Sequence, residues 1–312
     1  MLDRLDTKTD EKLEQAVMAT LTFFSLYELP LSARRIHELL YGELASFESV
    51  SQTLADLVAS GKILQIDNLF SIKPWNPVAY QANQIELVKK WSQIDRYFNW
   101  LAVLPFVRNL SVINSLAMGT ADTDSDIDFF VITSPRRLYF VRSVIIVLFR
   151  SLGVYKTRQK IKDRFCFGFY TTSDNLQFES LLLKPADPYF VFWLASMRPV
   201  FGSQVYWQLM QNNQWLTEKF PNLEIMQRLS SAKEPSFIIK TIKLILELLL
   251  WVPAALIEPL LRRIHIKHTF KLAENRALTS TTIANPKMLK LHAYDVRAEI
   301  AKRYSDELQK AK

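Results

Sequence analysis

Residues 112–133 read VINSLAMGTADTDSDIDFFVIT, and this stretch decides the fold that we expect. It begins in one apolar segment typical of a β-strand, residues 107–113, and ends in another, residues 129–132. Because side chains on a strand point alternately to opposite faces, Asp126 and Asp128 should share one face. The stretch therefore predicts two strands joined by a polar loop, with a pair of carboxylates where the second strand begins.

This carboxylate pair is the candidate metal site. Two like charges close together disfavour joint ionisation unless a cation neutralises them. Oxygen ligands of this kind suit Mg²⁺, or Mn²⁺ in its place, which keeps bound waters and takes further ligands from substrate phosphates. Small or polar residues in the preceding loop leave backbone N–H groups approachable by phosphates. These candidate nucleotide-binding residues are Asn114, Ser115, Gly119 and Thr120.

The pattern resembles the signature of the nucleotidyltransferase superfamily that includes polymerase β, over roughly residues 99–177. In that signature a Gly-Ser pair closes one strand, and Asp-x-Asp begins the next strand after a spacer. Ser115 stands at the Ser position, Asn114 replaces the first Gly, and Gly119 matches a second Gly of the spacer. The alternative interpretation is a polar surface loop that enters a buried strand.

The resemblance implies an α/β (α+β) fold with a small mixed sheet and helices packed against it. It also implies that Asp126 and Asp128 are catalytic and hold Mg²⁺ or Mn²⁺. The substrate would be a nucleoside triphosphate, with ATP favoured, and a nucleoside monophosphate would pass to a hydroxyl of an acceptor. That acceptor would be a small molecule, a protein or an RNA.

One departure from the family pattern concerns the catalytic base. The family usually carries a third carboxylate on a strand beside the Asp-x-Asp strand, and residues 165–172 (FCFGFYTT) are the strand expected there. This segment contains no acid, and the nearest are Asp163 before it and Asp174 after it. A nucleotide-binding regulatory protein with weak or no catalysis is therefore the alternative function.

Basic residues occupy every second position just before that strand. If the segment is extended, its five cations lie on one face and could bind a triphosphate or a nucleic-acid backbone. A solvated basic loop is the competing interpretation. The five residues are Lys156, Arg158, Lys160, Lys162 and Arg164. The preceding residues 136–152 predict an apolar helix that begins at Ser134-Pro135.

Residues 1–75 predict a separate module. Helical patterns at 13–27, 33–41 and 46–59 precede a hairpin with its turn at Asp67-Asn68,. Three helices and a hairpin resemble a winged helix-turn-helix, which would place its third helix in a DNA groove. Residues 46–61 contain no Lys or Arg, although phosphate contacts supply most non-specific affinity,. We therefore favour a protein partner for this module over DNA binding.

Residues 181–312 predict a helical region. Helices are expected at 187–197, at 202–212 with an extension to 220 left open, and at 286–312. Residues 237–261 are the most apolar stretch, but four charges and two prolines interrupt it. A buried amphipathic helix is favoured there, no transmembrane segment is expected, and membrane contact is the alternative. His265 and His268 have a spacing that could bind metal, but surface positions are favoured.

Composition places the chain among globular cytoplasmic proteins. The single cysteine, Cys166, excludes an intrachain disulfide and fits a reducing compartment,. Residues 1–75 hold 7 Lys or Arg against 11 Asp or Glu, whereas the remainder holds 32 against 20. A basic body favours a polyanionic or nucleotide partner. Breaks in pattern predict a module at 1–75, a catalytic core at 76–180 that opens with a helix at 79–102, and a helical region at 181–312.

Overall fold

The computed structural model describes residues 2–274, 282–291 and 295–310, with side chains described from residue 10 to 271 in the first range. The chain is a mixed α/β fold with two sheets, as the sequence predicted. The first half contains the elements α1 (Leu2–Ser25), β1 (Leu31–Ser32), α2 (Ala33–Glu38), α3 (Phe47–Ala59), β2 (Leu64–Ile66), β3 (Leu69–Ser71), α4 (Pro77–Arg96), α5 (Phe98–Ala102), β4 (Val107–Val112), α6 (Asn114–Met118), β5 (Ile127–Thr133) and α7 (Leu138–Ser151). The second half contains β6 (Phe165–Thr172), the 3-10 helix η1 (Glu179–Leu181), α8 (Pro188–Ser196), β7 (Arg198–Phe201), α9 (Ser203–Gln211), α10 (Gln214–Lys219), α11 (Ile225–Ser231), α12 (Phe237–Glu274), β8 (Ile283–Ala284), β9 (Met288–Lys290) and α13 (Arg297–Lys310).

The N-terminal module has the predicted helices and hairpin. Ser32 and Ser46 begin α2 and α3 by accepting hydrogen bonds from the backbone N–H groups of Arg35 and Ser49,. Strand β1 pairs with β3, and β3 pairs with β2, so the hairpin gains a third short strand that the sequence did not predict. The outer face of α3 carries Glu48 and Asp56.

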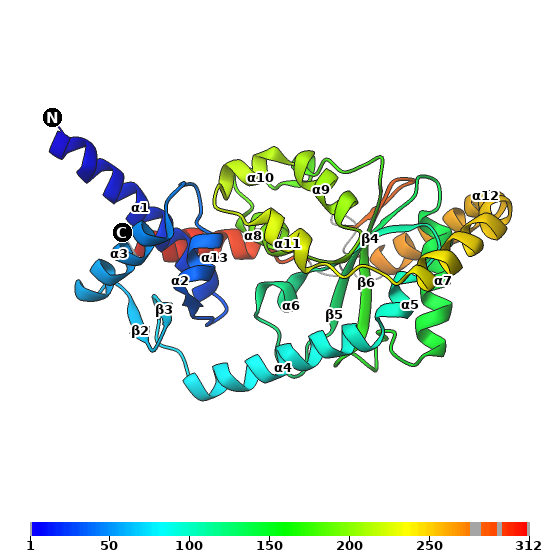
Figure 1. Ribbon diagram of the computed structural model, residues 1–312, viewed down its shortest axis with the longest axis horizontal. Helices are drawn as coiled ribbons and strands as arrows, with labels where there is room; N and C mark the ends of the chain where they lie inside the picture. The colour runs from blue at the N-terminus through cyan, green and yellow to red at the C-terminus, as the bar shows by residue number, and fades with distance from the viewer. Residues whose placement is uncertain (1, 275–281, 292–294, 311–312) are drawn as a thin grey trace.

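The larger sheet contains six strands in the order β7-β4-β5-β6-β9-β8. Strand β5 runs antiparallel to β4 and parallel to β6, with α7 in the crossover between β5 and β6. This mixed arrangement confirms the three strands predicted around the Asp-x-Asp stretch. Strand β7 extends one side of the sheet, and β9 extends the other. In Figure 1 these strands form the centre of the molecule, between the N-terminal module and α12.

Alternate residues of the central strands enter two separate apolar cores. Phe130 and Ile132 contact the core that includes the N-terminal module, α8, α9 and α13. Phe129 and Val131 contact the opposite core, which α4, α5, α7 and α12 cover. Because the first core runs from α1 to α13 through the central sheet, it crosses both boundaries predicted at residues 75 and 180. Those boundaries stay predictions.

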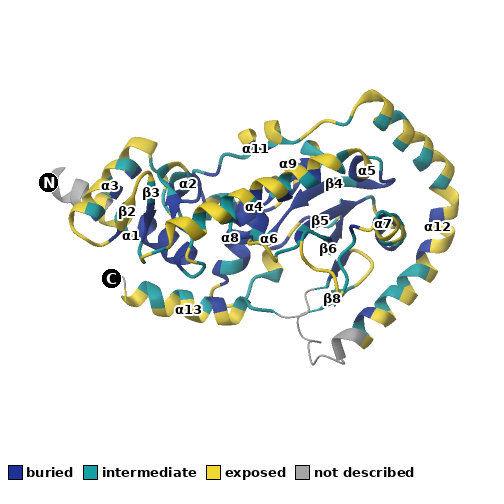
Figure 2. Cartoon of the chain, turned by 90° about the horizontal axis from the view of Figure 1, so that it is seen from below, coloured by how far each residue is buried: buried dark blue, intermediate teal, exposed yellow. Residues whose placement is uncertain are grey.

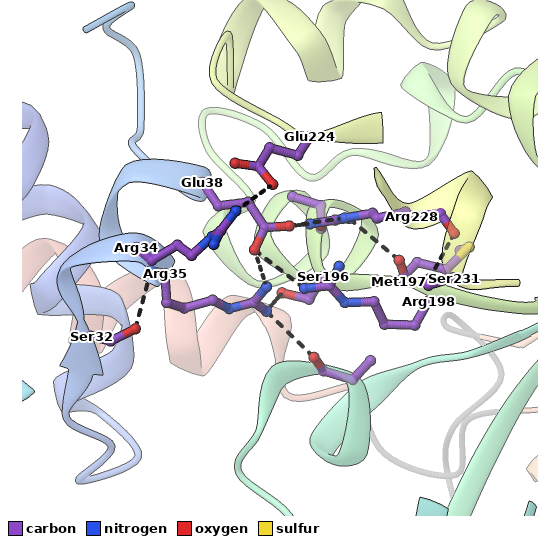
Figure 3. Close-up of polar contacts among 12 residues, drawn as sticks. Ser32, Arg34, Arg35, Glu38, Ser196, Met197, Arg198, Glu224, Arg228 and Ser231 are labelled. Atoms are coloured by element: carbon purple, nitrogen blue, oxygen red, sulfur yellow. Dashed lines mark hydrogen bonds and ion pairs between the residues drawn. The ribbon is translucent and has the colours of Figure 1, made fainter. Parts of the chain in front are cut away.

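A buried charged cluster joins the N-terminal module to the rest of the chain (Figure 3). Glu38 of α2 lies 2.5 Å from Arg228 Nη2, 2.6 Å from Arg35 Nη1 and 3.2 Å from Arg198 Nη2. Arg35 also donates to the Ala117 carbonyl at the C-terminal end of α6, at 3.4 Å. The module is therefore tied by ion pairs to β7 and α11, and by one hydrogen bond to α6, the helix that follows β4.

Several predicted helices have different limits in the structure. The helix expected at 79–102 is two helices, because the chain breaks at Tyr97 between α4 and α5. The helix left open to residue 220 is also interrupted, since the Asn213 amide binds backbone groups of Leu176 and Phe178 between α9 and α10. The tail expected to be helical from residue 286 first forms strand β9, because residues 288–290 pair with β6.

The start predicted for α7 at Ser134-Pro135 was wrong. The helix begins at Leu138, and no side chain at its own N-cap accepts a hydrogen bond. Instead, the carboxylate of Glu258 on α12 accepts from the backbone N–H groups of Tyr139 and Phe140 at 3.0 and 2.7 Å. The cap therefore comes from a residue about 120 positions away in the sequence.

The prediction that residues 237–261 form a buried helix was also wrong. Helix α12 is 38 residues long and packs along α7 at one end of the molecule. Only 11% of its most apolar stretch is buried. Figure 2 shows the exposed outer side of this helix curving around α7. Among the residues that the structure describes, α12 alone is long and apolar enough to cross a membrane by length and composition.

Candidate metal and nucleotide site

The carboxylates of Asp126 and Asp128 lie together at the start of β5, as the alternation of the strand predicted. The structure adds Cys166 of β6, whose register partner across the parallel pair is Asp128. One ligand atom of each of these three side chains lies within 4.8 Å of the others, and all three residues are half-buried. The cluster therefore joins two oxygen ligands and one sulfur ligand from adjacent strands.

Asn114 holds the Asp128 carboxylate in place. Its backbone has a φ of +56°, and its Nδ2 donates to Asp128 Oδ2 at 2.9 Å. Trp193 of α8 donates its indole N–H to Asn114 Oδ1. Because the amide oxygen already accepts this bond, the amide nitrogen is the end that faces Asp128. Trp193 in turn stacks on Phe169 and Phe190, so an aromatic group fixes the position of this amide.

Lys156 is the basic residue that reaches the carboxylate pair. Its Nζ lies 2.6 Å from Asp126 Oδ2, an oxygen that has no hydrogen bond of standard geometry. The extended basic face predicted for residues 156–164 does not form, because a turn closes with the Thr157 N–H donating to the Lys160 carbonyl. Arg164 instead donates to the Gly153 carbonyl at 2.6 Å.

The electrostatics of the cluster follow from burial and proximity. Burial and the neighbouring Asp126 raise the pKa of Asp128 to about 6, although bonds from Asn114 and Cys166 oppose the shift. Burial and the Asp128 carboxylate raise the pKa of the Cys166 thiol well above its usual value. Burial works against the charge of Lys156, but Cys166, Asp126 and Asp128 together raise its pKa. The cluster thus holds a carboxyl group, Asp128, whose ionised form is disfavoured, and a protonated thiol, Cys166.

The other predicted nucleotide-binding residues lie on and after α6. The N–H groups of Gly119 and Thr120 already donate to the carbonyls of Leu116 and Ser115, at 3.3 and 2.8 Å. Gly119 ends α6 with a φ of +85°, a conformation that favours glycine,. Its position is therefore explained by the helix end, and its part in phosphate binding stays a prediction.

Neither Asp163 nor Asp174 supplies the third carboxylate. Asp163 lies 2.6 Å from the fully buried Lys90, and Asp174 lies 3.0 Å from Lys287. Neither acid belongs to the cluster found among the described His, Cys, Asp and Glu side chains. Cys166 is the third side chain of that cluster. Nothing in the sequence indicated this role for Cys166, because the pairing of β6 with β5 that places it opposite Asp128 is a property of the fold.

The residues present fit a divalent cation. Two carboxylates with one oxygen lacking a standard hydrogen bond are ligands that Mg²⁺ or Mn²⁺ accepts, whereas a protonated thiol is a poor ligand for Mg²⁺,. A bound cation would also remove the repulsion that raises the pKa of Asp128,. His265 is not part of any such cluster among the described residues, since its Nε2 lies 2.8 Å from Ser143 Oγ.

Comparisons of the chain with protein-family models, with curated proteins and with solved structures find no match.

Proposed function

We propose that this chain binds a nucleoside triphosphate together with Mg²⁺ or Mn²⁺ at Asp126 and Asp128, as a nucleotidyltransferase of the polymerase β type. The observation that carries the proposal is the convergence of both carboxylates at the start of β5, with Cys166 of the adjacent strand β6 beside them and the short helix α6 before them. The order β4-α6-β5-α7-β6, with its antiparallel and then parallel pairing, supports it. ATP is the favoured nucleotide, and a cytoplasmic location would supply both ligands.

In this proposal the residues of the chain have separate tasks. Asp126 and Asp128 would hold the cation, which would supply positive charge to neutralise the phosphates during transfer. Asn114, fixed by Trp193, orients Asp128. Lys156, whose Nζ lies 2.6 Å from Asp126 Oδ2, would supply a positive charge to a phosphate bound beside the cation. The acceptor hydroxyl belongs to a small molecule, a protein or an RNA.

A second candidate function is regulatory nucleotide binding without efficient transfer. It is favoured by Cys166, which stands beside Asp128 where a third carboxylate would act as a base. General-base help contributes typically about 10²- to 10⁴-fold to a rate. Without it, transfer would depend on the cation and on positioning alone. Both functions share the same metal-dependent nucleotide site.

The N-terminal module, which resembles a winged helix, is proposed to contact a protein partner rather than DNA. The exposed side of its third helix carries Glu48 and Asp56. These carboxylates would repel a phosphate backbone.

Isothermal titration calorimetry of the full chain with ATP, with and without Mg²⁺, tests the shared site. We expect binding that requires Mg²⁺, because the carboxylates and the triphosphate repel each other without a cation. Asp128→Asn should abolish that binding, whereas the matched variant Asp174→Asn should retain it. Equal affinity with and without the metal would overturn the proposal for both candidate functions.

A further inference from the structure

Helix α12 presents a continuous apolar surface on its outer side. Every exposed residue between positions 242 and 260 is apolar. The most prominent are Leu244, Leu248, Leu249, Trp251, Val252 and Leu256, each more than half exposed. Soluble proteins rarely leave a contiguous apolar patch of this kind uncovered. The surface formed by these six residues is called the α12 outer face below.

The polar residues of the same span point the opposite way. Lys243 Nζ donates to the Val107 carbonyl at 2.6 Å, and Glu247 receives two bonds of 2.9 Å from Arg108. Glu258 caps α7, as described above. Three of the four charges that interrupt the apolar stretch in the sequence are therefore satisfied by the body of the protein, and the fourth, Lys240, pairs with Glu234 before the apolar face begins. A surface helix in water turns its apolar side toward the body and its polar side outward, whereas α12 between 242 and 260 does the opposite.

Exposed charge near the α12 outer face is positive. Arg263, Lys267 and Lys271 are exposed toward the C-terminal end of α12, where Arg262 is half-buried. Neither carboxylate of the span from 242 to 260 is free, since Glu247 and Glu258 bind the body. A surface that is apolar along its length and basic at one end complements an anionic lipid surface.

A pocket of about 890 Å³ adjoins this face and has the same character. It is lined by Trp251 and Pro259 of α12 and by the basic residues Arg136, Arg137 and Arg262. Arg137 is buried, lies 5.2 Å from the ring centres of Phe106 and Trp251, and donates to the carbonyls of Arg136 and Trp251. Arg136 is exposed and Arg262 is half-buried at this pocket, and a guanidinium beside an apolar surface suits the phosphate of a lipid headgroup,.

A second copy of the chain fits the face less well. A parallel pair of α12 helices would bring two basic ends together. In an antiparallel pair each basic end would meet Lys240 and Glu234, whose carboxylate already pairs with Lys240. A helix that spans the bilayer also fits less well. The bonds at Lys243, Glu247 and Glu258 hold α12 against the body, and a spanning helix would have to break them.

We propose that the α12 outer face docks in the plane of a bilayer surface that contains anionic phospholipids, with the body of the protein on the aqueous side. At about 1.5 Å per residue the apolar stretch from 242 to 260 is about 28 Å long. Its side-chain bonds to the body, rather than its length, favour a helix that lies along the bilayer surface over one that spans it. This docking is independent of the nucleotide site and goes beyond the proposed function.

Co-sedimentation of the full chain with vesicles tests the docking. One set of vesicles is phosphatidylcholine alone, and the other is equal parts phosphatidylcholine and phosphatidylglycerol. The chain should sediment with the anionic vesicles and much less with the neutral ones. The double variant Leu248→Glu/Leu256→Glu should lose binding to both. Ile85→Glu on α4, at a side chain as exposed as Leu248, is the matched control and should bind as the wild type does.

A second pair of substitutions tests the basic end. Arg263→Gln/Lys267→Gln should weaken binding to anionic vesicles by about 30-fold, since each of the two cations near such a surface contributes roughly fivefold. Binding to neutral vesicles should not change. All of these side chains are exposed, and a thermal melt of each variant verifies that the fold is intact.

Three results would overturn the docking proposal. The first is a wild-type chain that fails to bind anionic vesicles. The second is a Leu248→Glu/Leu256→Glu variant that binds as the Ile85→Glu control does. The third is a lipid-free dimer, detected by light scattering, that the leucine substitutions dissociate in a chain that does not bind vesicles. The α12 outer face would then be covered by a second copy of the chain.

Discussion

Cys166 on β6 lies in register beside Asp128 on β5, and its thiol lies within 4.8 Å of the Asp128 carboxylate. The thiol stands where a third carboxylate would complete the proposed metal site. Its pKa is raised by burial and by Asp128, so the cysteine adds no negative charge at neutral pH. This pair of residues therefore offers a direct way to vary the charge of the site.

We predict that Cys166→Asp raises the affinity for Mg²⁺ or Mn²⁺ and lowers the stability of the metal-free chain. A third buried carboxylate adds like-charge repulsion, which a cation would relieve. Thermal melts with and without the metal measure both effects, and Cys166→Ser is the control without a charge. If nucleotidyl transfer occurs, labelled NTP should also turn over faster in the Asp variant. A melting temperature that does not respond to the metal in Cys166→Asp would contradict the prediction.

Asp126→Asn should stop nucleotidyl transfer, whereas Asp163→Asn should slow it modestly or not at all. Asp163 neutralises the buried ammonium of Lys90 at 2.6 Å and lies outside the acidic cluster. Its loss should instead destabilise the fold by about 2 kcal/mol, less than for a fully buried pair because Asp163 is partly exposed. Single-turnover kinetics and urea unfolding separate the two effects. Equal loss of transfer in both variants would show that Asp163 acts in catalysis.

Trp193→Phe should weaken metal binding by roughly tenfold. The substitution keeps an aromatic ring beside Phe169 but removes the N–H that fixes the Asn114 amide, and outer-shell partners of metal ligands typically have effects of this size,. Trp215→Phe is a matched control, since Trp215 donates to Asn213 Oδ1 at 3.1 Å outside the site. Calorimetric titration with Mn²⁺ measures both variants. Equal Mn²⁺ affinities of Trp193→Phe and Trp215→Phe would mean that Asn114 does not need the hydrogen bond from Trp193.

Glu38→Gln should destabilise the chain at pH 7 by about 3 kcal/mol. Burial alone would raise the pKa of Glu38, but Arg228, Arg35 and Arg198 outweigh it and lower the pKa to about 2. Because the folded pKa is depressed, the stabilisation is present above the unfolded pKa of about 4.3 and is lost as the pH falls toward 2.

Urea unfolding between pH 7 and pH 2.5 measures this effect. The difference in free energy of unfolding between wild type and Glu38→Gln should shrink as the pH falls from about 4.3 toward 2. Glu234→Gln, which alters an exposed pair with Lys240, should change little at any pH,. A gap between wild type and Glu38→Gln that stays constant down to pH 2.5 would show that the arginine cluster does not hold the charge of Glu38.

The sequence by itself determined the local elements around the candidate site. Apolar runs and their alternation predicted the strands that became β4, β5 and β6, and the same alternation placed Asp126 and Asp128 on one face. The helices and hairpin of residues 1–75 were also predicted, since caps such as Ser32 and Ser46 act within three residues. These features depend on periodicity and local bonds, which a short stretch of sequence contains in full.

Only the tertiary structure decided which distant residues meet. Cys166 lies beside Asp128 because β6 pairs with β5, and Glu38 meets Arg228 across 190 positions of sequence. The tertiary structure also decided the orientation of α12, whose composition predicted a buried helix. Its charges at Lys243, Glu247 and Glu258 turn inward because the body supplies their partners, and its apolar side is left outward. The direction in which a helix faces depends on partners elsewhere in the chain, which its own sequence does not name.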